Sequence, residues 1–285
     1  MGLQRIVEPA ALPIDTVEAR NHVRQDVLTD DALLALYLRS AASFAEDRTG
    51  RTLVASRWKR TIDQFPGPSL MGVPVGTVFS LPGAAILLER GPVLAIQSIK
   101  YIDMAGVQQT LSPTLYKADL SSLPARVTPV FGSIWPPVLP QIGSVEIIYD
   151  AGDVAPLTFA SASPTITIRG GIWKPLTVGD NLRFSNSGGA LPANLAVDTD
   201  FYVQNVGVGT FTVSATSGGA ALTIADAGTG THYIGRAHDS VRAWMLTRIG
   251  GLFENREDAV IVQRGSMLSI PYVDSLLDHA TVYLN

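Results

Sequence analysis

Apolar side chains recur at helical spacing near the start of the chain and predict a long helix there. From about Asp30 to Thr49 they form two neighbouring lines at intervals of three or four residues. Leu34, Leu38, Ala41 and Ala45 make one line, and Leu33, Tyr37 and Phe44, with the small polar Ser40 at the fourth position, make the other. Thr29 or Asp30 can cap the start of this helix, and Gly50 is a natural C-terminal stop.

Two further segments carry helical signals. Asp15 followed by Glu18 resembles a capping box, so a short helix is expected from about Thr16 to Arg24. The helical period returns after residue 235 and predicts a helix within 237–258, whose apolar positions are Val241, Met245, Ile249 and Leu252 with Trp244 alongside. Pro271 begins a final turn or short helix.

Between these helices the period changes to that of strands. The stretches expected to be strands are 86–88, 96–102, 145–149, the chain end from Thr281 to Leu284, and a stretch that starts at Trp58 and ends at Phe65–Pro66. The sequence from Asp103 to Gly106 separates two such runs and predicts a hairpin turn. The run from Ile134 to Pro140 holds three prolines, which cannot donate to a strand ladder, so an extended, ordered arm is expected.

Residues 154–235 differ in kind from the rest of the chain. Short β-type runs recur there about every ten residues, separated by clusters of Gly, Ser and Asn. Their only charged residues are Arg169, Lys174, Asp180, Arg183, Asp198, Asp200 and Asp226. We therefore expect an α+β protein. Residues 1–153 and 236–285 would form one discontinuous domain, a helical bundle with an antiparallel β region. Residues 154–235 would be an inserted all-β domain of sandwich or barrel type.

Composition narrows the function classes. The net charge of −4 argues against a protein that grips nucleic acid through its phosphates, because such proteins concentrate Lys and Arg. There are no cysteines, which excludes disulfides and thiolate chemistry and fits folding in a reducing cytosol. The uncharged stretch from Gln64 to Leu88 contains four prolines and four glycines, so it is expected to form loops and buried strands rather than a membrane span.

The sequence predicts no catalytic, cofactor-binding or metal-binding site. The four histidines are scattered, and neither a phosphate-binding glycine loop nor a nucleophile elbow is present. The charged run from Glu254 to Asp258 holds three carboxylates beside Arg256. This run could be a solvated helix end, an acid/base pair or a subunit interface. Of these three interpretations we favour the subunit interface. Trp135 among its prolines is expected to pack against its own domain rather than to bind a ligand.

With these residues in view, the discontinuous domain resembles the head-to-tail connector (adaptor) family of tailed bacteriophages, the gp6-like proteins in their longer gp8-like subgroup. The resemblance rests on the order and spacing of several pieces rather than on one motif. These pieces are Val17–Arg24, Asp30–Arg51, Asp63–Pro66, Arg90–Val93, Ser98–Gly106, Tyr116, Pro124–Val127, Trp135–Pro136, Val145–Gly152, Leu252–Glu257, Pro271 and Leu276–Leu277. The 154–235 segment departs from the family pattern and resembles small β modules of virion proteins.

The resemblance implies a non-enzymatic structural protein of the virion neck, made in the host cytoplasm. Its copies would form a ring, usually of twelve, that docks beneath the portal protein and presents a surface to a stopper or tail-completion protein. Genomic DNA would pass through the ring without sequence-specific binding, and no membrane would be involved. Candidate inter-subunit ion pairs involve Arg48, Arg51, Arg256 and Glu257, and Val282, Tyr283 and Leu284 are candidates for strand addition to a partner.

The sequence also allows an alternative function, that of a binding protein. The 154–235 segment would then be the working part of a virion accessory protein that binds carbohydrate or a host surface. Its aromatic residues Trp173, Tyr202 and Tyr233 could stack on sugar rings, although such aromatics belong to a core about as often as to a platform. A hydrolase is the weakest reading, because it requires a carboxylate pair in one cleft.

Overall fold

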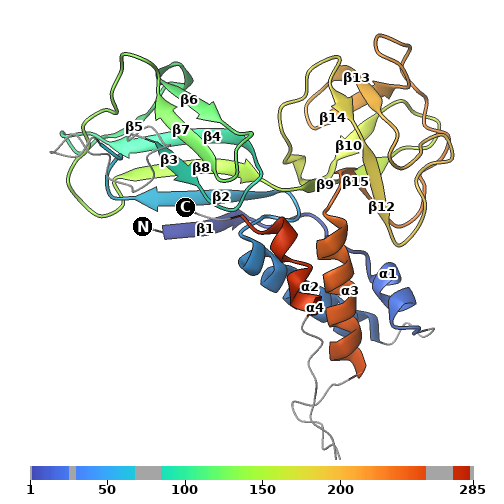
Figure 1. The fold of residues 1–285 in the computed structure, drawn as a ribbon. Coiled ribbons are helices and arrows are strands. Elements are labelled where there is room, and N and C mark those ends of the chain that lie inside the picture. The colour runs from blue at the N-terminus through green and yellow to red at the C-terminus, as the bar shows by residue number, and fades with distance from the viewer. Residues whose placement is uncertain (1, 26–29, 68–84, 255–271, 283–285) are drawn as a thin grey trace, which may run out of the picture.

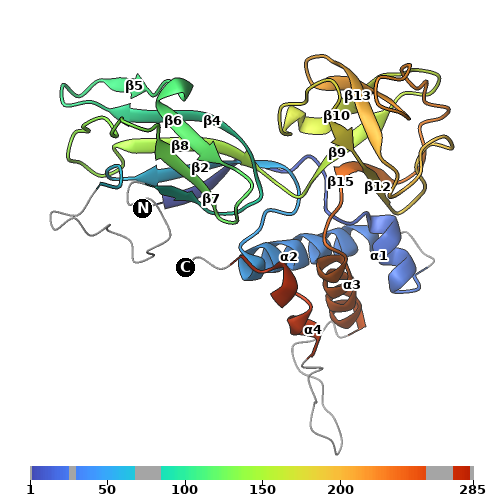
Figure 2. The ribbon, with the colours of Figure 1, turned by 45° about the horizontal axis from the view of Figure 1, so that its top comes forward.

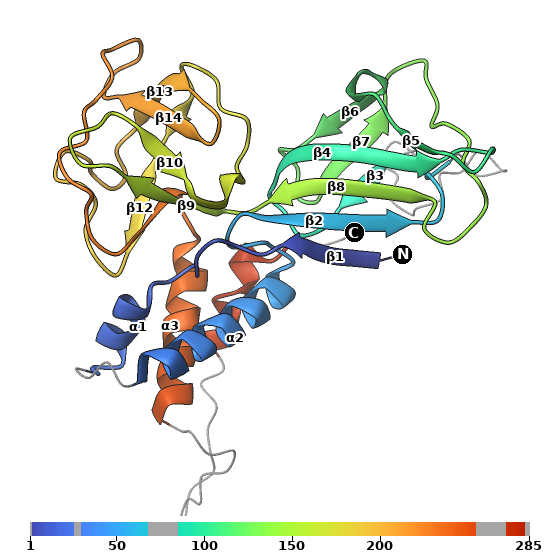
Figure 3. The ribbon, with the colours of Figure 1, turned by 180° about the vertical axis from the view of Figure 1, so that it is seen from behind.

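The computed structural model describes residues 2–25, 30–67, 85–254 and 272–282. Two β units lie side by side, and a group of helices lies below them (Figure 1). The same arrangement is seen after a 45° turn and from behind (Figures 2 and 3). The chain therefore has the mixed α and antiparallel β character that its sequence predicts.

The helices form where the apolar periodicity predicts them. Their bounds are α1 Thr16–His22, α2 Asp31–Thr49, α3 Asp239–Glu254 and α4 Tyr272–Ser275, with short 3₁₀ turns at Pro113–Leu115, Arg169–Gly171 and Asp278–Ala280. Gly50 adopts a left-handed conformation (φ 66°) and ends α2 as expected. Of the two apolar lines on α2, the one beginning at Leu34 is fully buried, and it packs against Trp244 and Met245 of α3.

The first β unit stacks a five-stranded sheet on a three-stranded one, and all their pairings are antiparallel. The larger sheet has the order β1 Gly2–Val7, β2 Ser56–Ile62, β8 Val145–Ala151, β4 Val93–Ile102 and β5 Gln108–Thr110. The smaller has the order β3 Ile86–Leu88, β7 Ala125–Pro129 and β6 Tyr116–Asp119. One apolar core joins them, to which Ile147 and Tyr149 of β8 and Val127 of β7 belong.

The second β unit is a nearly closed, barrel-like sheet of seven strands within residues 154–235. The strand order is β11 Asn181–Leu182, β13 Phe201–Val206, β14 Thr210–Ser214, β10 Ile166–Ile168, β9 Val154–Phe159, β15 Thr231–Gly235 and β12 Phe184–Ser187. Alternate strand residues fill its interior, among them Phe184 and Phe211, which are each 1% exposed. β9 begins and β15 ends at the bounds expected for this segment, and these two ends pair as Val154 with Gly235.

Some expectations from the sequence need correction. β1, β6 and β7 were not predicted. β2 ends at Ile62 rather than at Phe65–Pro66, and α1 ends at His22, two residues earlier than expected. Residues 222–224, one of the short β-type runs expected to be strands within 154–235, form no strand, although Ile224 makes an isolated bridge to Ser163. At the chain end, Thr281 and Val282 lie outside any strand, and the remaining residues of that predicted strand are outside the described part.

The hairpin turn and the proline-rich arm agree with their predictions. β4 and β5 pair across the turn, where Asp103 accepts the backbone N–H groups of Ala105 and Val107. Trp135 is buried and stacks on Phe65 with 4.7 Å between ring centroids, so it packs within its own unit. None of the helices in the described ranges combines the length and the hydropathy that crossing a membrane requires.

Candidate interface surfaces and the junction between units

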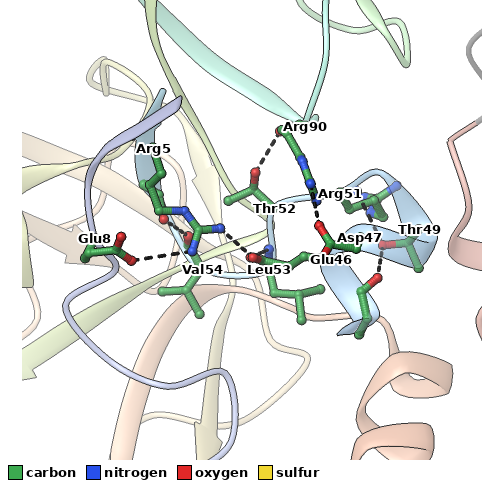
Figure 4. Close-up of polar contacts among 12 residues, drawn as sticks. Arg5, Glu8, Glu46, Asp47, Thr49, Arg51, Thr52, Leu53, Val54 and Arg90 are labelled. Atoms are coloured by element: carbon green, nitrogen blue, oxygen red, sulfur yellow. Dashed lines mark hydrogen bonds and ion pairs between the residues drawn. The ribbon is translucent and has the colours of Figure 1, made fainter. Parts of the chain in front are cut away.

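The C-terminal end of α2 joins the helices to the first β unit (Figure 4). The Glu46 carboxylate, 7% exposed, accepts the backbone N–H of Leu53 at 2.9 Å and pairs with Arg5 of β1. A carboxylate near a helix C-terminus opposes the helix dipole, so these two donors offset an unfavourable position. Residue 46 thus fixes α2, β1 and the chain that follows the helix in one arrangement.

Trp58 of β2 lies between two arginines at the same junction. The Arg5 guanidinium is 4.6 Å from the Trp58 ring centroid, and that of Arg90 is 5.5 Å from it. Arg90 also pairs with Asp47 of α2, next to Glu46. Cation–π contact with Trp58 and ion pairing with the two acidic residues therefore act together, and the end of α2 is held to the sheet from both sides.

Arg51, a candidate for contact between subunits, instead lies in a buried pair within the chain. Its guanidinium donates to both Asp153 oxygens at 2.6 and 3.2 Å, and the two side chains are only 9% and 6% exposed. Burial raises the pKa of the Asp153 carboxyl, and the Arg51 charge opposes that rise. Because Asp153 immediately precedes β9, the pair anchors the chain where it leaves the first β unit for the second.

The other candidate interface residues fall into two groups. Arg48 is on the surface and makes a 3.5 Å ion pair with Asp278, in which the two side chains are 56% and 53% exposed. Val282 donates its backbone N–H to the Thr49 carbonyl at 2.7 Å, which places the end of the described chain beside the end of α2. Arg256, Glu257, Tyr283 and Leu284 lie outside the described residues.

A polar network that the sequence did not reveal docks the second β unit on α1. Asp15 caps α1 by accepting the Val17 N–H at 2.8 Å, as expected. The predicted reciprocal contact from Glu18 is wrong, because the Asp15 N–H instead donates to Ser187 of β12 at 2.7 Å. Glu18 pairs with Arg242 of α3 at 2.6 Å. The capping residues thus connect three elements that lie far apart in the sequence.

Of the three aromatics considered for a sugar platform, Tyr233 has a structural role. Tyr233 is 3% exposed and donates its hydroxyl to the Leu12 carbonyl, so it belongs to the core shared with the helices. Trp173 is half-buried and lies against the end of β15, where its ring is 3.2 Å from the position that a Cβ on Gly235 would occupy. Tyr233 is therefore unavailable for stacking on a ligand, whereas Trp173 and Tyr202 are only partly buried.

His232 is the one histidine within the second β unit, and it has a structural role. It is 5% exposed; one ring nitrogen is 2.9 Å from the Asn186 amide nitrogen and the other is 3.0 Å from the Ala227 carbonyl oxygen. Burial lowers its pKa, which favours the neutral imidazole. In the part of the chain that the structure describes, no group of three or more metal-ligating side chains converges.

Two apolar surface features lie in the first β unit and at its junction with the helices. At the end of the sheet remote from the helices, Phe131, Ile134 and Ile142 are almost fully exposed. At the junction, an open groove of about 500 Å³ runs between residues 8–13 and α2. The sequence predicted neither feature, because both depend on how connecting segments fold over the surface.

Comparison with known proteins is informative only at the level of structure. No protein-family model matches the chain, and no curated protein sequence matches it. A chain of a solved structure described as "Virion of native gene transfer agent (GTA) particle" matches with a TM-score of 0.54 at 14% identity, covering 99% of this chain and 96% of that one. The present chain therefore shares its fold with a component of that virion. A chain of "Neck of empty GTA particle computed with C6 symmetry" gives 0.52 at 15% identity, with the same coverage.

Proposed function

We propose that this chain is a non-enzymatic subunit of a neck ring that joins the DNA-filled head of a tailed phage-like particle to its tail. The observation that carries the proposal is a fold match that covers 99% of this chain, at TM-scores of 0.54 and 0.52, to chains of a gene transfer agent virion and neck. The order of sequence pieces that resembles the connector family supports it independently, because that resemblance rests on residue types and spacing alone.

The coverage of the match also bears on the domain organisation. Since 99% of this chain aligns, the match includes residues 154–235 and does not skip them. Their close docking supports the same conclusion, because Val154 and Tyr233 belong to the core formed with the helices. We therefore propose that residues 154–235 are an inserted β domain that works as a fixed part of the neck protein. Residues 1–153 and 236–285 form the adaptor domain.

The proposed partners follow from that place in the particle. Copies of the chain close into a ring through a head-to-tail contact, because only such a contact generates a ring. A dodecamer remains our proposal for the copy number, with the portal on one side and a stopper or tail-completion protein on the other. A channel through such a ring does not require a basic lining, and a net charge of −4 per copy is compatible with free passage of DNA.

The proposal is tested by imaging the purified chain alone and mixed with the portal protein of the same particle. Closed rings that sit coaxially on the portal are the expected result. Charge reversal by Arg256→Glu should weaken assembly, whereas Lys117→Glu at a surface strand of the smaller sheet should leave it unchanged. A chain that remains a single molecule under both conditions would overturn the proposal.

A further inference from the structure

The end of the first β unit remote from the helices carries an unusual set of exposed apolar side chains. Phe131 is 107% exposed, Ile142 92% and Ile134 87%, while Met104 and Val107 are 60% and 53% exposed. A protein surface normally scatters such residues singly, so five of them at one end of a sheet require an explanation.

Backbone contacts bring these residues to the same place. The hairpin that carries Met104 and Val107 follows Ile102, the last residue of β4. The backbone N–H of Ile102 donates to the Ser144 carbonyl, and the Ile102 carbonyl accepts the backbone N–H of Leu139. Ile142 lies between Leu139 and Ser144 in the sequence and is therefore held next to this hairpin. Ile134 adjoins Trp135, whose ring stacks on Phe65 just beyond the end of β2. A tight turn, closed by a 3.0 Å bond from the Ser133 N–H to the Val130 carbonyl, presents Phe131. We call these five residues the apolar tip.

The area of the apolar tip approaches that of one side of a protein interface. Five large apolar side chains at these exposures present on the order of 600 Å². The largest apolar patch on a typical monomer is about 300–600 Å², and each side of a standard interface buries about 800 Å². The tip alone therefore supplies most of one side of a stable interface.

The groove at the junction offers a partly apolar surface. Its walls are residues 8–13 on one side and Arg39, Ala42, Ser43 and Glu46 of α2 on the other, with Leu53 and Val54 as further lining. Arg5 also lines the groove, where its charge is paired with that of Glu46. Arg39 is exposed and makes no ion pair with another described residue. Residues 127–145, which include the tip loop, carry no charge, so this loop can offer backbone carbonyls to Arg39 without opposing it.

The tip and the groove of one chain cannot meet. Val54 in the groove precedes β2, and the tip lies beyond its other end, so the seven residues of β2 separate them by roughly 23 Å at about 3.3 Å per residue. A tip that fills a groove therefore belongs to a different copy. Because the two surfaces differ, the contact is head-to-tail, the type that a ring requires.

We infer that the apolar tip of one copy docks in the groove between residues 8–13 and α2 of the next copy. This inference rests on the proposed ring and adds to it the pair of surfaces that meet. The chain contains no cysteine, so a disulfide can be introduced without a competing thiol. Phe131→Cys in the tip and Ser43→Cys in the groove are exposed positions whose replacement leaves the core intact.

The experiment mixes the two single-cysteine chains, one carrying a size tag, under mild oxidation. The expected product is a mixed Phe131→Cys/Ser43→Cys dimer that forms at least tenfold faster than either like dimer. The matched control pairs Phe131→Cys with Val208→Cys, which is 102% exposed but outside the groove, and it should give no such preference. A chain that carries both substitutions should yield a ladder of covalent oligomers.

Ring assembly of substituted chains provides a second readout. Phe131→Ser with Ile134→Ser should weaken association on the order of tenfold or more, as expected for central apolar anchors. Leu36→Ser, at an exposed apolar position of α2 outside the groove, should leave it unchanged. Thermal melting of each variant checks that the fold is retained.

The outcomes separate this inference from the proposed function. If unsubstituted rings form but Phe131→Cys links equally to Val208→Cys, or only to itself, the tip–groove contact is wrong and the ring stands. If the tip substitutions leave ring assembly unchanged, the contact is likewise wrong. If the unsubstituted chain forms no ring with or without portal, both the ring and the contact are overturned.

Discussion

Replacing Arg51 by methionine tests whether the buried ion pair at the junction is a main support of the fold. The substitution keeps an unbranched apolar stem in place of the arginine stem and removes the guanidinium group with its charge. Asp153 then remains as a carboxylate that is 6% exposed and has lost both guanidinium hydrogen bonds. The backbone N–H of Asp153 still bonds to Thr52, so the loss is confined to the side chains.

The expected cost follows from this burial. Removing one partner of a buried pair costs about 3–5 kcal/mol, because the remaining charge is left uncompensated. For a chain of this size each kcal/mol corresponds to about 2 °C in melting temperature, so a decrease of roughly 6–10 °C is expected. The exposed Arg48–Asp278 pair provides the matched control, and Arg48→Met should cost less than about 1 kcal/mol.

The pH dependence gives a sharper test. Burial raises the folded-state pKa of Asp153 above its unfolded value, so ionisation of this group opposes folding as pH rises through that folded pKa. Loss of Arg51 increases the rise. The difference in melting temperature between Arg51→Met and the unsubstituted chain should therefore be largest at neutral pH and should shrink in mildly acidic buffer.

The assay is thermal denaturation at several pH values of the unsubstituted chain, both single variants and Arg51→Met with Asp153→Asn. The double variant should recover much of the stability at neutral pH, because it buries no charge. A deficit of Arg51→Met that is the same at every pH, and that Asp153→Asn leaves unrelieved, would refute the reasoning.

Three further substitutions probe other parts of the fold. Gly152→Ala should lower the stability of the folded chain by about 1–3 kcal/mol in thermal melting, since the new Cβ would lie 2.5 Å from the Ala55 backbone. The control is Gly251→Ala on α3, whose Cβ would meet nothing within 4 Å and which should leave the melting temperature nearly unchanged. Phe184→Ala should cost about 3–5 kcal/mol in urea unfolding by opening a cavity in the second β unit; a smaller loss would mean that the cavity collapses. Asp15→Ala should cost about 0.5–2 kcal/mol by removing the cap of α1.

The helices and half of the strands of the first β unit, namely β2, β3, β4 and β8, were predictable because their burial follows a regular period. α2 shows this clearly, since the line through Leu34, Leu38 and Ala41 fixes both the helix and its buried side. β1 lacked such a signal. It is an edge strand whose Arg5 is held by Trp58 and Glu46 rather than by an apolar core. A strand of that kind shows little alternation between apolar and polar positions.

The candidate interface residues were less predictable, because charge pairing depends on distance in space. Arg51 and Asp153 are 102 positions apart, and Glu18 meets Arg242 from 224 positions away. The sequence showed that such charges exist but not which of them are already paired within one chain. The apolar tip was hidden for a related reason, because exposure of Phe131 is decided by the tight turn that carries it.

The pairing of Val154 with Gly235 has a practical consequence for anyone who wishes to shorten or replace the second β unit. Neighbouring strands lie about 5 Å apart, so a linker of two or three residues can span the cut ends. Excision at these bounds, however, also removes Tyr233 and Val154 from the hydrophobic contacts over the helices. A replacement domain must therefore supply apolar side chains that cover Ile14 and its neighbours. Without that cover, the shortened protein would expose an apolar surface that promotes aggregation.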